Sequence, residues 1–406
     1  QEFFLSQQYP CLFYIPRRYQ NYHSDMNGGG RGTYGIVKKF DSRNGCPSVA
    51  IKKFIKPFES TNRAQLVLRE LHLLRTLRHP NIWRLIECYT ANRAGDIDGI
   101  YHISEHCGET LQIKIMQGKY AMSDTITWTR ELLEALQYLH SFGEIHREIH
   151  TGCICISATN KLTLVGFGRG RVIDRENTLS SEWGSKRNPY KLIEEMLACG
   201  QDEHTEKIVD AEELVAEKYT QPYMPLEELV EWDKKHDAKV DIWSVGVVLC
   251  EIITGVNLFG EDRISNSLKR QIEYCGPTSD KVLGKIKSDV ERSFVKEYSR
   301  KFERQDFVKI LCDSMLPGRD IEPDDLVECE HSLKDFLDDI LQLDPDDRMS
   351  AEEALSHPFL LPPSPWNQEL PNDENEARQI LKEQLRKAAM DSDFYSSHHH
   401  NLIHPL

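Results

Sequence analysis

The pattern of apolar and polar positions predicts extended segments near the start of the chain. Residues Tyr19 to Asp41 follow an extended pattern, and two more strand-like runs cover Ile82 to Tyr89 and Gly99 to Ser104. Further along, short apolar runs flank the segments Ile145–Cys155 and Leu164–Gly168, which is typical of short buried strands. The strands therefore gather toward the start of the chain, with short ones near its middle.

Helical spacing of apolar residues predicts a second group of elements. These cover Asn62–His79, Ser123–Phe142, Lys239–Gly255 and, as two helices around the turn Asp344–Pro345, Leu333–Leu361. Pro80 ends the first helix, and Ser123 or Asp124 caps the second. The third is apolar nearly all round and closes with glycine, so we expect it to be buried. Shorter helical patterns cover Tyr190–Leu197 and Glu374–Met390.

Composition describes an ordinary soluble protein with an acidic balance. Of 406 residues, 39% are apolar and 28% are charged, and the formal net charge is −15. This charge argues against nucleic-acid and anionic-membrane partners, because no basic surplus is available to displace counterions. No apolar run reaches the length of a membrane span, and we expect no signal peptide. The 11 cysteines lack C-x-x-C spacing, which indicates reduced thiols in a cytoplasmic or nuclear location.

A glycine-rich turn carries the first candidate chemistry. Gly30, Gly32 and Gly35 form a G-x-G-x-x-G pattern, which alone is weak because flexible hairpins also produce it. The continuation Val49-Ala-Ile-Lys52 strengthens the pattern, since backbone N–H groups at glycines can approach phosphates while the lysine supplies a positive charge. Glu70, on the helix that follows, is placed to pair with Lys52 rather than to remain a solvated surface glutamate.

The segment Ile145–Cys155 carries the second group of candidate functional residues. It reads I-H-R-E-I-H-T-G-C-I-C, is followed by Gly166-Phe-Gly168, and resembles the catalytic loop H-R-D-x-x-x-x-N and the D-F-G of protein kinases. Where kinases have the aspartate that orients the substrate hydroxyl, this chain has Glu148. Where they have two magnesium ligands, it has Cys153 and Gly166.

These replacements weaken the chemistry of phosphate transfer. Magnesium prefers oxygen ligands, so the thiol of Cys153 is too soft, and Gly166 offers no side chain. Glu148 carries its carboxylate one methylene further out, which would impair positioning rather than abolish it. His150, where kinases have a phosphate-steadying lysine, is neutral at pH 7 and gives only part of that charge. Cys153 and Cys155 could bind a soft metal only with further ligands that the spacing does not supply, and we predict no metal site.

Within the kinases, the chain looks most like the stress-activated MAP kinases. The strings that carry this resemblance are Pro16-Arg-Arg-Tyr-Gln-Asn21, Ala50-Ile-Lys-Lys-Phe54, Lys56-Pro-Phe-Glu-Ser60, Arg69-Glu-Leu-His-Leu-Leu74 and Val240-Asp-Ile-Trp-Ser-Val-Gly246. The resemblance implies an α+β, bilobal kinase fold: a five-stranded small lobe with one main helix at 19–104, and a hinge and mainly helical large lobe at 105–361. A long activation segment then covers 169–226, and a C-terminal extension covers 362–406.

The resemblance also implies particular contacts. An inner stack would contain Leu74, Leu85, His146 and Phe167. Pro225-Leu-Glu227 stands where kinases have A-P-E, so Glu227 should pair with Arg348. The catalytic residues would be Glu148, Lys52 and Glu70. The implied nucleotide site spans the glycine-rich turn, the third strand and the hinge, and consists of Gly29, Gly30, Arg31, Gly32, Thr33, Tyr34, Gly35, Ile36, Val37, Ala50, Lys52, Ser104 and Cys107.

The departures from the family leave two functional hypotheses. MAP kinases are switched on at a Thr-x-Tyr, whose phosphothreonine is captured by arginines including the one at Arg147, and no Thr-x-Tyr occurs between Gly168 and Glu227. We favour a pseudokinase, a monomeric binding module for signalling proteins of a MAP kinase pathway. Such a module could act with or without a nucleotide in its cleft, and ATP, if it binds, would bind weakly or independently of magnesium. The alternative is an active Ser/Thr kinase in which Glu148 helps to hold the metal in an unusual way.

Overall fold

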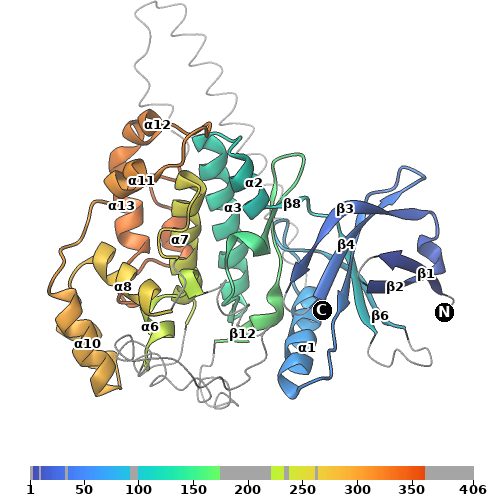
Figure 1. Ribbon diagram of the computed structural model, residues 1–406, viewed down its shortest axis with the longest axis horizontal. Helices are drawn as coiled ribbons and strands as arrows, with labels where there is room; N and C mark the ends of the chain where they lie inside the picture. The colour runs from blue at the N-terminus through green and yellow to red at the C-terminus, as the bar shows by residue number, and fades with distance from the viewer. Residues whose placement is uncertain are drawn as a thin grey trace, which may run out of the picture. The chain divides into compact units, whose positions relative to one another are not determined.

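The computed structural model describes residues 3–8, 11–32, 35–91, 99–173, 221–232, 237–260 and 264–361 (Figure 1). The chain divides into two compact units at Leu360, and nearly all of the second unit lies beyond the described residues. The helices predicted at Tyr190–Leu197 and Glu374–Met390, and most of the segment 169–226, also lie outside them. In the described part, no helix is long and apolar enough to cross a membrane.

The predicted small lobe is built on one antiparallel sheet. Within the described residues its order is β3-β4-β5-β7-β6, so the prediction of five strands is confirmed. The strands are β3 (Tyr22–Gly32), β4 (Gly35–Ser42), β5 (Val49–Phe54), β6 (Leu85–Thr90) and β7 (Ile100–Glu105). Ahead of them, β1 (Phe3–Gln8) and β2 (Cys11–Pro16) form a hairpin, and Phe13 and Ile15 of β2 are fully buried in the same core as Phe40 and Tyr101.

Helix α1 (Thr61–Thr76) lies alongside this sheet (Figure 1). Its N-terminus is capped by the Ser60 hydroxyl, which accepts a hydrogen bond from the Arg63 N–H at 3.2 Å. The helix ends earlier than the prediction of His79. Leu77 already has an extended backbone (ψ 136°) and turns its side chain into the core, where only 4% of it is exposed. Burial of this leucine therefore overrides the helical pattern before Pro80 is reached.

The rest of the described chain is mainly helical and confirms the α+β class. Its elements are β8 (Glu109–Thr110), α2 (Leu111–Gln117), α3 (Met122–Ser141), β9 (Glu144–Ile145), β10 (Ile154–Ile156), β11 (Leu162–Leu164), β12 (Arg171–Val172), α6 (Leu226–Leu229), α7 (Lys239–Thr254), α8 (Ile264–Cys275), α9 (Asp280–Lys285), α10 (Asp289–Ser299), α11 (Phe307–Ser314), α12 (Pro323–Glu328), α13 (Glu330–Ile340) and α14 (Ala351–Leu355). Both predicted helices around Asp344–Pro345 are present.

Helices α3 and α7 form the centre of this lobe. The prediction that α7 is buried is confirmed, because Trp243 is fully buried and Gly255 ends the helix with φ of 84°, a left-handed conformation that favours glycine. In α3 the predicted cap is shifted. Ala121 is the capping residue, and the Asp124 carboxylate lies in the first turn and accepts the Ala121 N–H at 2.9 Å.

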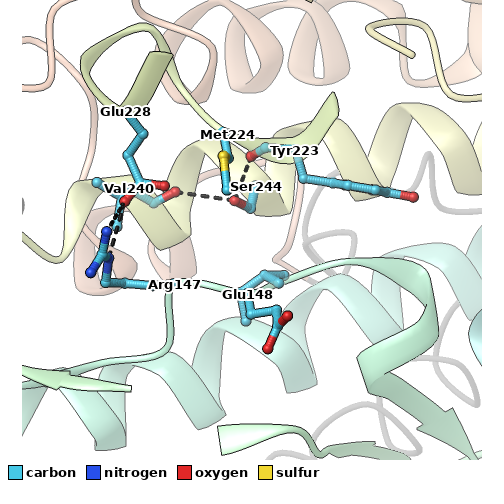
Figure 2. Close-up of a pocket in the computed structure, with 8 residues that line it drawn as sticks. Arg147, Glu148, Tyr223, Met224, Glu228, Val240 and Ser244 are labelled. Atoms are coloured by element: carbon cyan, nitrogen blue, oxygen red, sulfur yellow. Dashed lines mark hydrogen bonds and ion pairs between the residues drawn. The ribbon is translucent and has the colours of Figure 1, made fainter. Parts of the chain in front are cut away.

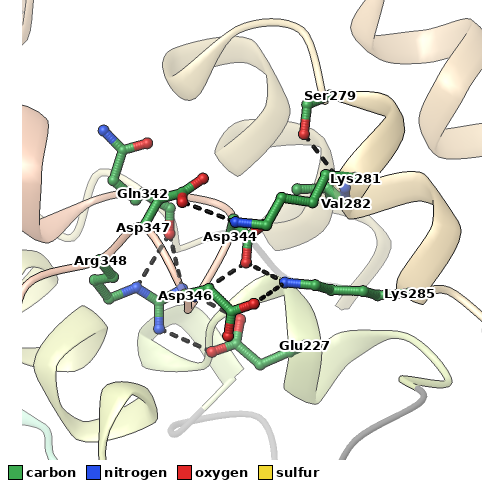
Figure 3. A network of polar contacts seen from close by, with 10 residues as sticks. All are labelled: Glu227, Ser279, Lys281, Val282, Lys285, Gln342, Asp344, Asp346, Asp347 and Arg348. Carbon is green, nitrogen blue, oxygen red and sulfur yellow. Dashed lines mark hydrogen bonds and ion pairs between the residues drawn. The ribbon is translucent and has the colours of Figure 1, made fainter.

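The predicted pair of Glu227 and Arg348 is confirmed. Arg348 Nη1 and Nη2 donate to the two Glu227 carboxylate oxygens at 2.8 and 3.2 Å, with both side chains almost fully buried. Figure 3 shows this pair beside a second one, in which Lys285 contacts Asp344 and Asp346. Together they join α6 and α9 to the turn after α13 within the helical lobe.

Candidate functional site

A buried carboxylate on α7 holds the loop that carries the candidate catalytic residue. Asp241 accepts the backbone N–H groups of His146 and Arg147 at 2.8 and 2.7 Å, and its Oδ2 lies 2.9 Å from His140 Nε2. Burial opposes charge on Asp241, but these hydrogen bonds outweigh it and lower its pKa. Arg147 has φ of 63°, so the loop is held in a left-handed turn. Sequence reasoning used Asp241 only as part of a family string and missed this function.

Lys52 and Glu70 form the predicted ion pair. Lys52 Nζ lies 2.5 and 2.7 Å from the two Glu70 oxygens, and His102 Nε2 lies 3.5 Å from Oε1 of the same carboxylate. Burial alone would raise the Glu70 pKa, but Lys52 and His102 lower it to about 2. Gly35 packs closely beside this lysine, because a Cβ there would lie 2.8 Å from the Lys53 carbonyl oxygen and 2.9 Å from the Lys52 side chain. The lysine that would face a nucleotide phosphate is therefore held by α1.

The Cys153 side chain links the end of the catalytic loop to its earlier residues Glu148 and His150. Its Sγ accepts the His150 N–H at 3.1 Å and lies 3.0 Å from the carbonyl oxygens of Glu148 and His150, to which its proton can be donated. The side chain is buried, and burial raises the thiol pKa well above its usual value. Cys153 is thus a neutral thiol engaged in local hydrogen bonds, and it presents no oxygen to a metal ion.

Glu148 is engaged by a cation from the segment that follows Gly166-Phe-Gly168. Its Oε1 lies 3.3 Å from Arg169 Nε, and the side chains are only 13% and 14% exposed. Burial raises the pKa of Glu148, while Arg169 and Lys52 oppose that shift and favour the charged form. The carboxylate in the candidate catalytic position is therefore one half of a mostly buried ion pair. Arg169 was not predicted as a site residue, since nothing in its local pattern marks it.

The Phe167 segment packs as the resemblance implies. The His146 and Phe167 rings meet edge to face with centroids 4.8 Å apart, and His146 Nε2 lies 3.1 Å from the Val165 carbonyl oxygen. All four predicted stack residues are buried, and Leu74, Leu85 and Phe167 share one core cluster. Gly166 has φ of 86° and so takes a conformation that side chains rarely adopt.

Arg147 points to a carboxylate of its own chain. Its Nε and Nη2 donate to Glu228 Oε1 at 3.0 and 2.9 Å, and Glu228 is 5% exposed. Figure 2 shows this contact at one side of a small cavity, with the Glu148 side chain directed away from Glu228. The cavity measures about 10 Å³, which is roughly the space of one water molecule. Arg147 is therefore held by α6 at the edge of this small cavity.

The described residues of the predicted nucleotide site lie on adjoining strands. Gly29, Gly30, Arg31 and Gly32 are in β3, Gly35, Ile36 and Val37 in β4, Ala50 and Lys52 in β5, and Ser104 in β7, with Cys107 just beyond. The sheet register sets Val37 opposite Lys52 and Ala50 opposite Ser104. Thr33 and Tyr34 lie outside the described residues. The Cys107 thiol is hydrogen-bonded to Cys155, which raises the Cys107 pKa well above its usual value.

The site does not fit a kinase-type magnesium ion. Gly166 has no side chain, the Cys153 thiol is neutral and hydrogen-bonded, and Glu148 is paired with Arg169. Magnesium needs several oxygen ligands in near-octahedral geometry, and these three positions supply one carboxylate that already has a cationic partner. Among the described residues, no group of three His, Cys, Asp or Glu side chains is arranged to hold a metal ion.

Comparison with known proteins agrees with this fold and motif order. The protein kinase domain model matches residues 25–191 and 200–360, and the chain belongs to the protein kinase family. Within it the chain is MAP kinase-like, with p38-like homologues. It is 30% identical over 345 residues to mitogen-activated protein kinase pmk-1 of Caenorhabditis elegans, covering 84% of this chain and 76% of the relative. For human mitogen-activated protein kinase 12 the identity is 28% over 343 residues, covering 83% and 77%.

His150 should make the protein less stable in mild acid. Burial, with smaller contributions from His146 and Arg169, lowers its pKa from 6.5 to about 4. Between these values the unfolded chain binds a proton that the folded chain does not, so stability falls as the pH decreases from about 6.5 to 4. His150→Asn can still accept the Gly152 N–H that Nδ1 accepts at 3.1 Å. We expect this variant to lose about 2 kcal/mol less than the wild type between pH 7 and 4.5, as measured by urea unfolding. Equal losses in the two proteins would contradict the assignment.

Proposed function

We propose that this MAP kinase-like protein is a pseudokinase, a binding module of a MAP kinase signalling pathway with little or no phosphate transfer. One observation carries the proposal. The positions of the two family metal ligands hold a bridging thiol and a glycine, and the nearby carboxylate of Glu148 is paired with Arg169. Phosphate transfer depends mainly on positioning and charge stabilisation, and these changes remove the oxygen ligands that hold the metal charge at the site.

The same site retains groups that suit a nucleotide. Lys52 is held by Glu70, and the glycine-rich turn between β3 and β4 can bring backbone N–H groups close to phosphates. We therefore propose that the cleft binds ATP with little or no dependence on magnesium. The residues we assign to it are those of the predicted nucleotide site.

The decisive experiment measures transfer and binding on one protein preparation. We expect purified protein to show no magnesium-dependent transfer of labelled phosphate to a generic substrate above the level of Lys52→Ala. In a thermal-shift assay, ATP should raise the melting temperature similarly with magnesium and with a chelator, and Lys52→Ala should remove that rise. Lys53→Ala is the matched control, because Lys53 neighbours Lys52 on β5 and contacts the Tyr101 ring instead of Glu70.

A second candidate, an active Ser/Thr kinase, rests on the intact Lys52–Glu70 pair and on the carboxylate of Glu148 at the catalytic position. It predicts transfer that is lost in Lys52→Ala and ATP stabilisation that appears only with magnesium. Either result would overturn the pseudokinase proposal.

The proposed location and partners follow from the net charge of the chain and from its likeness to MAP kinases. We propose that the chain is a monomer in the cytoplasm or nucleus and docks signalling proteins of a MAP kinase pathway, with no nucleic-acid or membrane partner. The net charge of −15 supports the last point. The pair of Arg147 and Glu228 supports a module whose structure does not depend on phosphorylation of a threonine. In this pair, the Glu228 carboxylate of α6 already binds the arginine that would otherwise bind the phosphothreonine.

A further inference from the structure

A histidine lies beside the ion pair of Lys52 and Glu70. His102 on β7 is the strand partner of Lys52 on β5, and directly opposite residues of an antiparallel pair direct their side chains to the same face of the sheet. The His102 ring is fully buried and packs against the rings of Trp83 and Phe54, at centroid distances of 4.9 and 5.7 Å. The imidazole is therefore fixed in place next to the Glu70 carboxylate.

The two ring nitrogens of His102 have different surroundings. Nδ1 lies 3.1 Å from the Ser104 hydroxyl oxygen, whereas Nε2 has no hydrogen-bond partner among the described residues and lies 3.5 Å from Glu70 Oε1. Burial lowers the pKa of His102, against the influence of Glu70, so the ring is neutral and has one N–H. A charged carboxylate only accepts hydrogen bonds. It therefore favours the tautomer with the proton on Nε2, in which Nδ1 accepts the Ser104 O–H.

The distance from Nε2 to Glu70 leaves this N–H available. At 3.5 Å the contact is longer than a good hydrogen bond, while both carboxylate oxygens contact Lys52 Nζ at 2.5 and 2.7 Å. A nucleotide phosphate that draws Lys52 toward itself would weaken the two contacts of the lysine with Glu70. The carboxylate could then move the short distance to Nε2, where a buried acceptor and a buried donor would satisfy each other.

We propose that His102 is the second partner of Glu70, which receives the carboxylate when Lys52 engages a nucleotide phosphate. His102 is a positioning residue, since it acts on the phosphate only through Glu70 and Lys52. It lowers the free energy needed to share the lysine between a carboxylate and a phosphate, and it keeps Glu70 on α1 in place. The inference rests on the proposed nucleotide binding and extends it, because it names a residue outside the predicted nucleotide site on which that binding depends.

The first test is the affinity for ATP, measured by titration calorimetry. His102→Leu fills most of the same space without an N–H and should weaken ATP binding by about tenfold. His102→Gln carries an amide N–H near the position of Nε2, so it should bind ATP within about twofold of the wild type. Equal affinities of the wild type and His102→Leu would overturn the proposal, and so would a failure of His102→Gln to restore binding.

Ile103→Ala is the matched control. Ile103 follows His102 on β7 and is equally buried, but its side chain packs in the other core cluster, with Phe40 and Tyr101. Ile103→Ala should therefore lower the free energy of unfolding and leave the ATP affinity unchanged. If it weakens ATP binding as much as His102→Leu does, the effect of His102 is one of packing and the proposal fails.

A measurement without nucleotide separates this inference from the proposed function. The nitrogen NMR resonances of the His102 ring report which nitrogen carries the proton, and we expect the Nε2–H tautomer. In Lys52→Ala the Glu70 carboxylate loses its lysine, so it should close on Nε2 and move the Nε2–H proton resonance downfield. The Nδ1–H tautomer, or an unchanged resonance in Lys52→Ala, would overturn the inference. If the wild type binds no ATP, the nucleotide proposal fails and these resonances alone decide about His102.

Discussion

Arg348→Met is expected to lower the free energy of unfolding by about 3–5 kcal/mol, because it leaves the Glu227 carboxylate buried without its cation. Glu227 is 2% exposed, and Arg348 also donates to the carbonyl oxygens of Gln342 and Lys239 and lies over the Trp243 ring. Methionine fills much of the same space, so the loss reports on charge and hydrogen bonds rather than on a cavity. Urea unfolding measures it directly.

Arg84→Met is the matched control for this prediction. Arg84 and Glu105 form an ion pair at 3.0 Å, but their side chains are 68% and 52% exposed. Exposed pairs of this kind contribute about 0–1 kcal/mol, so the control should barely change the unfolding midpoint. If both variants lose the same small amount, the Glu227–Arg348 pair does not hold α6 in place as described.

Asp241→Ala should be similarly damaging, and its effect should centre on the catalytic loop. The change removes the acceptor of the His146 and Arg147 N–H groups, and each buried donor left without a partner costs about 1–3 kcal/mol. It also removes the contact of His140 with Asp241. We therefore expect a loss of about 3–5 kcal/mol in total, and faster hydrogen exchange at the amides of residues 146 and 147.

Asp241→Asn tests the same assignment more gently. Its amide keeps one oxygen acceptor in nearly the same place, so the stability loss should be smaller and at least one of the two amides should remain protected. Unchanged exchange at both amides in Asp241→Ala would mean that Arg147 keeps its left-handed turn without this carboxylate.

Helices with a clear apolar periodicity could be predicted from the sequence. Helix ends that are set by tertiary packing could not. The apolar faces of α3 and α7 place them within one or two residues of their observed bounds. The end of α1 was wrong because burial of Leu77 is a tertiary effect with no local signature. The Glu227–Arg348 and Lys52–Glu70 pairs were predictable because motif order supplied both partners.

In the candidate site, too, some features could be predicted from residue types and others depend on tertiary contacts. The loss of oxygen ligands at Cys153 and Gly166 is visible in the residue types alone. The bridging function of the Cys153 thiol, the pairing of Glu148 with Arg169 and the pairing of Arg147 with Glu228 all depend on which groups meet in space. Each of those partners is an ordinary charged or polar residue in its own stretch of sequence, so no pattern singles it out.

The close approach of Gly166 to Cys153 bears on how such a site could change over generations. A Cβ at position 166 would lie 3.3 Å from the Cys153 Cβ, and φ there is 86°. Gly166→Asp alone would therefore introduce backbone strain and crowding while Cys153 still offered no oxygen. Cys153→Asn alone could keep the hydrogen bonds of the loop but would gain only one ligand. Neither single step yields a kinase-type metal site, because each supplies at most one oxygen ligand. A chain that acquired such a site would therefore have to change both positions, and selection for metal-dependent activity would not favour either change by itself.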